Sequence, residues 1–310
     1  MSQDGVYLRE LPFCEIYTLV QPGAVHYHLP AYFCHAGTAT VVSDFAAAGA
    51  VWRGGDHGRV LLLRPCGAVR AILHGAAGAE YSCRGRVRHP ERPVPAAHPL
   101  VLQHIPMLGY AVDQVGGPQI RNIGTIGGNV CNGVTSADSA SSLFAYNAIL
   151  ELTGPEGIRQ VPIQEFYTGP GKTVRRHEEV MTAIRIRRRD YEGYTGCYIK
   201  YGKRNAMEIA TLGCACLVKL SLDKKVVEDM RIAYGVAAPT PVRCPETEKA
   251  VSGKAVSKVL LLQTGKGVLN EVNPRTSWRA SKEFRLQLVE ELAKRAMAQA
   301  IRNGGGEVDA

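Results

Sequence analysis

A change in sequence pattern near residue 100 limits what this chain can fold into. Of the 49 residues from 51 to 99, 33 are Ala, Gly, Arg, Pro, His or Cys, and no apolar period of 2 or 3.6 residues is sustained there. Residues 84–93 read as a linker or a disordered arm. From about residue 100 onward, apolar residues recur at helix and strand spacings. Helices and strands are therefore predicted from about residue 100 onward, the pattern of residues 51–99 indicates neither, and the 310 residues suggest two domains.

The net charge of +9 does not indicate a nucleic-acid partner. Residues 51–99 hold eight arginines against three acidic residues, so more than half of the excess lies in a segment without aromatic interleaving or a helix face. No apolar run approaches the roughly 18–20 residues that span a bilayer. The first 30 residues resemble neither a signal peptide nor a transit peptide. We therefore expect a cytoplasmic protein without a nucleic-acid or membrane partner.

The nine cysteines do not form a metal-binding pattern. No Cys-x-x-Cys pair occurs, so neither a zinc site nor an iron–sulfur cluster loop is indicated, and no metal ligand is predicted. Cys214 and Cys216 are two residues apart in an apolar stretch, which on a strand places both on one face. We expect reduced cysteines, with these two packed in a core.

The periodicity after residue 100 predicts a mixed sequence of helices and strands. A helix is expected from Pro106 to about Val115, ended by Gly116–Pro118. A short helix near 139–146, a strand near 148–153 and a hairpin turn at 154–157 follow. A polar break at 187–190 marks a domain boundary. Beyond it we expect strands at 195–203, 208–220 and 227–237 and helices at 246–252, 254–271 and from Ser281, a candidate N-cap, to Gly304.

The segment from Gly124 to Asn129 is the strongest candidate for a binding site. A turn rich in glycine lets backbone N–H groups approach an anion, and Thr125 and Asn129 add side-chain donors. The spacing fits neither a dinucleotide fingerprint nor a Walker loop, and a turn without a ligand is the alternative. Asp138 has two interpretations: an acceptor for ribityl or ribose hydroxyls, or the N-cap of the next helix. The loop 169–173 is either part of a site or a solvated turn.

Several long motifs resemble one known family. They are Gly117-Pro118-Gln119-Ile120-Arg121-Asn122, Gly127-Gly128-Asn129-Val130-Cys131-Asn132, Thr135-Ser136-Ala137-Asp138-Ser139-Ala140, Phe166-Tyr167-Thr168-Gly169-Pro170-Gly171-Lys172, Gly235-Val236-Ala237-Ala238-Pro239-Thr240-Pro241 and Ser277-Trp278-Arg279-Ala280-Ser281-Lys282-Glu283-Phe284-Arg285. Together they resemble the FAD-binding subunits of molybdenum hydroxylases, above all those of multi-subunit xanthine dehydrogenases. The resemblance covers about residues 101–303.

The resemblance implies an α+β fold and an electron-transfer function. Residues 1–189 would form an FAD-binding domain of two subdomains, and residues 190–303 a domain with a three-stranded antiparallel sheet and a helical bundle. In such enzymes the molybdenum cofactor and two 2Fe–2S clusters lie on partner subunits, and FAD passes electrons to NAD⁺ or oxygen. Ten positions match the family's flavin contacts: Val115, Gly124, Thr125, Ile126, Gly127, Gly128, Asn129, Asp138, Met181 and Lys200. A lysine beside the ring would stabilise the negative charge of the reduced flavin.

The first hundred residues depart from the family pattern. The family has an earlier glycine-rich flavin loop, whose nearest counterpart here, Gly54-Gly55-Asp56-His57-Gly58, has unrelated neighbours. Residues 20–99 are thus either frame-shifted in the coding sequence or strongly diverged. Three functions stay open: a flavin subunit of a xanthine dehydrogenase, a flavin subunit of an aldehyde or carbon monoxide dehydrogenase, and a flavin-free structural or assembly subunit.

Overall fold

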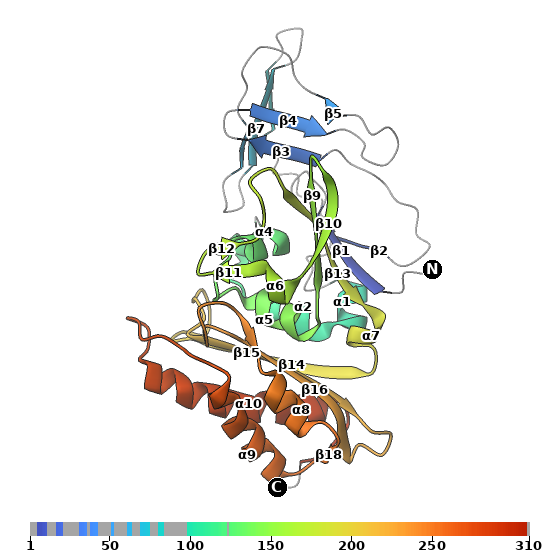
Figure 1. Cartoon of the computed structure of the whole chain (residues 1–310), viewed down its shortest axis with the longest axis vertical. Coiled ribbons are helices and arrows are strands. Elements are labelled where there is room, and N and C mark those ends of the chain that lie inside the picture. Colours follow the sequence, from blue (N-terminus) through green and yellow to red (C-terminus); the bar gives the residue numbers. More distant parts are fainter. Residues whose placement is uncertain are drawn as a thin grey trace.

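The computed structural model describes residues 98–122 and 124–308, together with the backbone of strands β1–β8 between residues 5 and 83. The elements form three tiers along the long axis (Figure 1). One end of the molecule carries two small antiparallel sheets, β3-β4-β5 and β6-β7-β8. Their strands are β3 (Ala31–His35), β4 (Thr38–Val42), β5 (Val51–Trp52), β6 (Leu61–Leu63), β7 (Val69–His74) and β8 (Glu80–Cys83). The expected arm at 84–93 and the run 54–58 lie outside the described residues.

The middle tier is built on a five-stranded antiparallel sheet in the order β10-β9-β13-β1-β2. Its strands are β1 (Gly5–Glu10), β2 (Tyr17–Val20), β9 (Ile149–Gly154), β10 (Gly157–Pro162) and β13 (Val180–Arg187), so the hairpin turn predicted at 154–157 is confirmed. Short helices and a small hairpin accompany the sheet: α1 (Pro99–His104), α2 (Pro106–Asp113), α3 (Pro118–Arg121), α4 (Ile126–Cys131), α5 (Asp138–Ala145), α6 (Ile163–Phe166), β11 (Tyr167–Gly169) and β12 (Lys172–Thr173). The helix expected from Pro106 is confirmed as α2, which ends at Asp113 instead of Val115, and its residues Leu108 and Ala111 are buried with Leu143 of α5.

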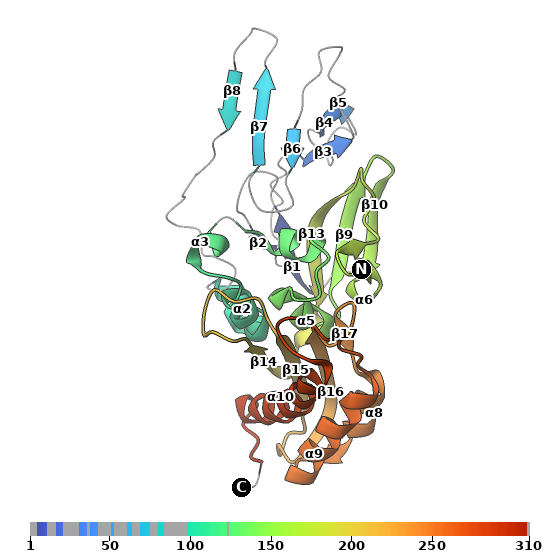
Figure 2. The same cartoon turned by 90° about the vertical axis from the view of Figure 1, so that its left-hand side faces the viewer.

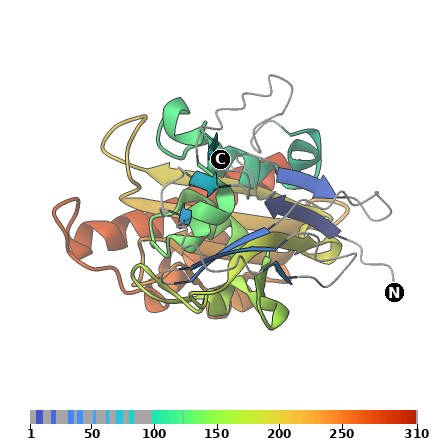
Figure 3. The ribbon, with the colours of Figure 1, turned by 90° about the horizontal axis from the view of Figure 1, so that it is seen from above.

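The C-terminal tier begins after α7 (Arg188–Tyr191), at the polar break. Three long antiparallel strands carry it, β14 (Tyr194–Tyr201), β15 (Leu212–Leu220) and β16 (Val226–Gly235), with the short strands β17 (Val242–Arg243) and β18 (Lys254–Ala255) beside β16. Helices α8 (Pro245–Val251), α9 (Lys258–Gly267) and α10 (Lys282–Asn303) cover one face (Figure 2). Helix α5 packs on the other face, so the helices of the middle tier lie over these strands when the molecule is seen from above (Figure 3). The α+β class is confirmed.

In the C-terminal tier, one predicted helix begins later than expected, and two other predictions are confirmed. The helix expected at 254–271 begins only at Lys258, because Ser257 caps it and residues 254–255 pair with β16 as a strand. The last helix begins as predicted: the Ser281 hydroxyl accepts a hydrogen bond from the N–H of Phe284. Cys214 and Cys216 are completely buried between β15 and α10 as free thiols, as expected.

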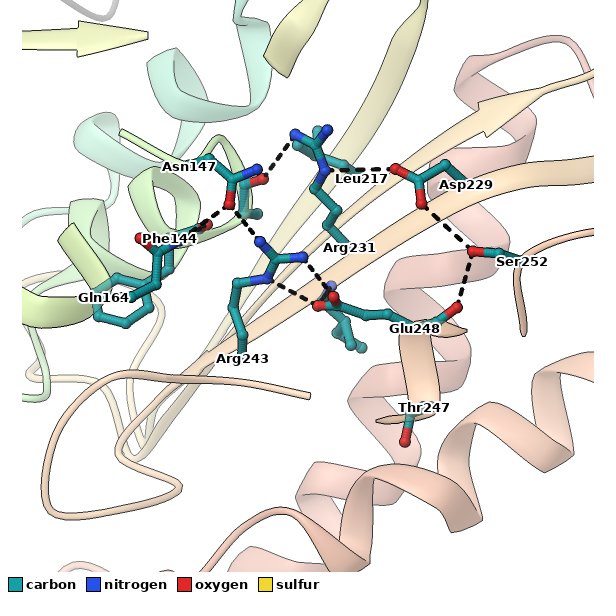
Figure 4. Close-up of polar contacts among 12 residues, drawn as sticks. Phe144, Asn147, Gln164, Leu217, Asp229, Arg231, Arg243, Thr247, Glu248 and Ser252 are labelled. Carbon is teal, nitrogen blue, oxygen red and sulfur yellow. Dashed lines mark hydrogen bonds and ion pairs between the residues drawn. The ribbon is translucent and has the colours of Figure 1, made fainter. Parts of the chain in front are cut away.

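A polar network joins the middle and C-terminal tiers (Figure 4). The guanidinium of Arg243 on β17 donates to Glu248 on α8 and to the side-chain oxygen of Asn147, which follows α5. Asn147 has a φ of 49°, a left-handed conformation that asparagine tolerates. Arg231 on β16 donates in turn to the carbonyl of Asp190 at 3.1 Å. Because these donors and acceptors come from both tiers, the network fixes how the tiers meet.

Among the described helices, none is long and apolar enough to cross a membrane.

Candidate functional site

The glycine-rich segment forms the start of a helix. Thr125 occupies the N-cap of α4, and its side-chain oxygen accepts a hydrogen bond from the N–H of Gly128 at 2.9 Å. The expectation of a turn through Gly127 and Gly128 is therefore wrong: both lie inside α4. The reason is the cap at Thr125 together with Ile126, which is buried in the core and anchors the first turn. Gly124 precedes the helix and donates to the carbonyl of Ile120 at 2.8 Å.

The N-terminus of α4 still presents groups that suit an anion. Helical geometry leaves the N–H groups of Ile126 and Gly127 without a partner inside the helix. Asn129 is half-buried one turn further along, and its Oδ1 accepts a hydrogen bond from the Ser139 hydroxyl at 2.6 Å. Within residues 98–122 and 124–308, no acceptor contacts its Nδ2 group. These donors match the chemistry of a diphosphate.

Asp138 lies at the first position of α5, where it is 6% exposed. Its carboxylate accepts a hydrogen bond from the Tyr198 hydroxyl at 2.7 Å and forms an ion pair with Lys200 at 2.8 Å. The alternative of an N-cap is wrong, because Ala137 occupies the cap position and the Asp138 side chain points to β14. Two residues that were predicted separately, Asp138 and Lys200, are thus brought into direct contact.

Burial controls the ionisation of this carboxyl group. Removal from water raises the pKa of Asp138, and the hydrogen bond and charge of Lys200 and the hydrogen bond of Tyr198 counteract this effect. Asp138 and Lys200 can each form further hydrogen bonds. A carboxylate offers about four acceptor sites, of which Tyr198 and Lys200 occupy two, and the third N–H of the ammonium group has no partner among the described residues.

Lys200 is one of the residues that line an open cleft. Its second acceptor is the backbone carbonyl of Gln114, at 2.8 Å, directly after α2. Lys200, Gln114 and Tyr110 line this cleft of about 1490 Å³, which runs between α2, β14 and α10. Val115, a predicted apolar contact, is half-buried beside Gln114.

Met181 does not join the cleft. It lies on β13, is 3% exposed and packs in the same core as Ile126. Among the ten predicted residues, Lys200 is the one that the described structure places in the lining of the cleft; Asp138 adjoins it through the ion pair, α4 adjoins Asp138 through the hydrogen bond between Asn129 and Ser139, and Met181 packs in the core beside α4.

The loop at 169–173 is the exposed turn between β11 and β12, in agreement with the alternative of a solvated turn, and one backbone hydrogen bond joins it to the segment between α4 and α5. The N–H of Gly171 donates to the carbonyl of Gly133, between α4 and α5, at 3.0 Å. Four further groups of the site were not predicted from the sequence. They are the side chains of Ser139 and Tyr198 and the backbone carbonyls of Gln114 and Thr135, the last of which accepts a hydrogen bond from the residue that follows β16. A tyrosine two residues before the predicted lysine, on the same strand face, was the one signal available for Tyr198.

The two parts of the chain that carry this site each match a known protein family. Residues 94–187 match the family described as the FAD binding domain in molybdopterin dehydrogenase, and residues 197–300 match the CO dehydrogenase flavoprotein C-terminal domain. A putative xanthine dehydrogenase FAD-binding subunit, XdhB of Escherichia coli K12, is 42% identical over 210 residues, which are 68% of this chain and 71% of that protein. The chain belongs to the FAD-binding subunits of xanthine dehydrogenase-type molybdenum hydroxylases.

More distant members agree with this assignment. The carbon monoxide dehydrogenase medium chain of Hydrogenophaga pseudoflava is 30% identical over 65% of this chain and 69% of its own length. A solved structure of carbon monoxide dehydrogenase from that organism matches with a TM-score of 0.63 at 30% identity, over 67% of this chain and 71% of the other. Quinoline 2-oxidoreductase from Pseudomonas putida 86 shares the fold at 19% identity.

The residues of the site fit FAD, the cofactor by which the family is described. The N–H groups of α4 and the Nδ2 group of Asn129 suit the diphosphate. The spare acceptor sites of Asp138 and the spare N–H of Lys200 suit a flavin, which presents both donors and acceptors. The earlier glycine-rich loop of the family has no counterpart among the described residues.

Proposed function

We propose that this chain passes electrons from 2Fe–2S clusters of a partner subunit through FAD to NAD⁺, in a xanthine dehydrogenase whose molybdenum cofactor lies on another partner. We further propose that residues 1–189 form the FAD domain, that residues 190–303 form the second domain, and that the enzyme is cytoplasmic and acts on purines. The observation that supports the proposal is that the candidate residues contact one another in an unbroken series from α4 to Lys200. Asn129 contacts Ser139, which adjoins Asp138, and Asp138 pairs with Lys200.

When bound, FAD accepts electrons one at a time and transfers them in pairs as a hydride. The tasks of this chain are binding and electrostatics. The N–H groups of Ile126 and Gly127 and the amide of Asn129 would hold the diphosphate. Lys200 places a cation at the cleft, and Asp138 neutralises part of its charge. The pair would therefore set how strongly the site favours added negative charge on a bound cofactor.

The proposal is tested in two steps on the purified full chain. FAD is added and its dissociation constant is measured by flavin fluorescence; we expect saturable binding of one FAD per chain. The loaded protein is then mixed with NADH without oxygen. Bleaching of the flavin absorbance would support NAD⁺ as the acceptor, whereas bleaching by dithionite but not by NADH would argue against it.

The substrate is decided in the assembled enzyme. Xanthine dehydrogenase is favoured because the E. coli relatives are 42–43% identical, against 30% for the carbon monoxide dehydrogenase medium chain. Turnover of hypoxanthine without turnover of aldehydes or carbon monoxide would support the purine branch. The opposite pattern would assign the chain to an aldehyde or carbon monoxide dehydrogenase.

A flavin-free structural or assembly subunit is the second candidate. It is favoured by one observation: the first of the two family matches begins at residue 94, so almost a third of the chain precedes both of them. A well-folded chain that binds no FAD in large excess, yet assembles with its partners, would establish this function. Sequencing the coding DNA would show whether another reading frame restores the missing loop.

A further inference from the structure

The carboxylate of Asp138 is held entirely by one strand of the C-terminal tier. Tyr198 donates to Oδ1 at 2.7 Å and Lys200 donates to Oδ2 at 2.8 Å. Both residues lie on β14, two positions apart, so their side chains leave the same face of the strand. A residue of the middle tier that faces the flavin site is therefore oriented from the neighbouring tier.

The tyrosine occupies a space that the sheet keeps open for it. Gly213 on β15 is the register partner of Lys200, and a Cβ at Gly213 would lie 3.0 Å from the Tyr198 hydroxyl. Tyr198 is 2% exposed, and burial raises its pKa far above the usual value. Its hydroxyl group thus stays protonated, and as a neutral donor it has Asp138 as its acceptor.

The backbone that leads to Asp138 is held by the same sheet. The N–H of Val236, directly after β16, donates to the carbonyl and to the hydroxyl oxygen of Thr135, both at 3.1 Å. Val236 has a φ of 68°, which is costly for a β-branched residue. At Gly235 a Cβ would lie 2.8 Å from the Thr135 carbonyl oxygen, so glycine permits this close approach. The loop before α5 and the side chain of Asp138 are therefore fixed from two strands.

We propose that Tyr198 is a positioning residue of the flavin site, which keeps Asp138 ionised, oriented and paired with Lys200. This inference rests on the proposed function. Without the phenol, a buried carboxylate loses one of its two partners and takes up a proton more readily. A protonated Asp138 would leave Lys200 as an uncompensated cation at the cleft. Tyr198 thereby determines the pH range over which the site carries the neutral ion pair instead of a bare positive charge.

Among the described residues, few titratable groups lie close to the pair. Lys200 is the cation, and Tyr110 on α2 and Cys214 on β15 lie close to the tyrosine; burial raises the pKa of the Cys214 thiol. The backbone carbonyl of Gln114 is the remaining polar neighbour. The pH dependence of the pair is therefore expected to follow Asp138 alone.

The test compares two buried Tyr→Phe variants in the full-length chain. Tyr198→Phe removes the hydrogen bond to Asp138, whereas Tyr234→Phe removes a hydrogen bond to the Val289 carbonyl on the opposite face of the same sheet. The dissociation constant of FAD is measured from pH 5 to 8. For Tyr198→Phe we expect binding about 3- to 10-fold weaker, with its pH dependence moved to higher pH; for Tyr234→Phe we expect the wild-type profile. Gly213→Ala, which displaces the tyrosine ring, should reproduce Tyr198→Phe.

A second readout needs no FAD. Lysines of the flavin-free protein are acetylated with an activated ester, and each site is quantified by mass spectrometry. Lys200 should react several-fold faster in Tyr198→Phe than in wild type, while the exposed Lys172 in the same sample serves as the reference. Binding and labelling values equal to those of Tyr234→Phe would overturn the inference, as would a change in only one of the two. A wild-type chain that binds no FAD would reject the proposed function, whereas the labelling still decides whether Tyr198 holds the pair.

Discussion

Gly133 and Gly171 contact each other through their backbones, although they belong to motifs almost forty residues apart. A Cβ at Gly133 would lie 2.9 Å from the carbonyl carbon of Gly171, and Gly133 has a φ of 69°. We expect Gly133→Ala to lower the free energy of unfolding by about 2–4 kcal/mol, because it adds a backbone clash to a strained conformation.

Gly171→Ala is the matched control for this prediction. Gly171 has nearly the same φ, 70°, but nothing lies within 4 Å of the position that its added methyl group would take, so only the conformational cost of about 1 kcal/mol is expected. Urea denaturation measures the free energy of unfolding of both variants. Equal losses in the two variants would show that the close approach at Gly133 does not matter.

Glu179 should give the middle tier an acid-sensitive contribution to stability. It is 5% exposed and accepts hydrogen bonds from the Arg159 guanidinium and from the N–H of Arg176 at 2.6 Å, and Arg159 holds the pKa of this carboxyl below its usual range. A lowered pKa stabilises the fold above the pKa of the unfolded chain, and this stability is lost as the pH falls through the folded value. Glu179→Gln should therefore cost about 1–3 kcal/mol at pH 7 and progressively less below pH 4.5.

Thermal unfolding between pH 3 and 8 measures this effect. Glu156→Gln removes an ion pair to Arg176 from a side chain that is 83% exposed, so a change of about 0.5 kcal/mol or less is expected. A Glu179→Gln deficit that stays constant with pH would contradict the assignment.

Arg285 should be a stability determinant of the C-terminal tier. It is 2% exposed and donates to the carbonyls of Thr211, Arg275 and Ala280 and to the Ser277 hydroxyl oxygen. Arg285→Met would take away the guanidinium donor from the buried carbonyls of Thr211 and Arg275, whereas the Ala280 carbonyl and the Ser277 hydroxyl keep backbone donors, and we expect a loss of about 2–4 kcal/mol in urea denaturation.

The exposed Arg295 on the same helix provides the comparison. Its side chain is 67% exposed and pairs with Glu291, so Arg295→Met should cost about 1 kcal/mol or less. A similar small loss for Arg285→Met would mean that water reaches the released carbonyls.

Asn129→Asp tests the diphosphate position almost without changing shape. Aspartate keeps the acceptor for the Ser139 hydroxyl but replaces the two Nδ2 donors by a negative charge. We expect FAD to bind at least about tenfold more weakly, with unfolding unchanged.

Asn270→Asp adds the same charge at an exposed position after α9 and should leave FAD affinity unaltered. Titration of flavin fluorescence compares the variants. Wild-type affinity in Asn129→Asp would place the diphosphate away from α4.

Local patterns were sufficient for most elements beyond residue 100. The start of α2 at Pro106, the hairpin at 154–157 and the Ser281 cap all depend on residues close in sequence, and each is confirmed. The glycine segment was misread because helix propensity disfavours Gly127 and Gly128, whereas the Thr125 cap and the buried Ile126 decide the local structure.

The sequence by itself determined the family, the α+β class and the likeness of Asp138 and Lys200 to flavin contacts, because motifs and periodicity are local properties of the chain. Only the tertiary structure decided that these two side chains bind each other, that Tyr198 holds one of them, and that Gly133 lies against Gly171. Such contacts depend on how two tiers pack, over separations of 38 to 62 residues, and no spacing along the chain encodes them.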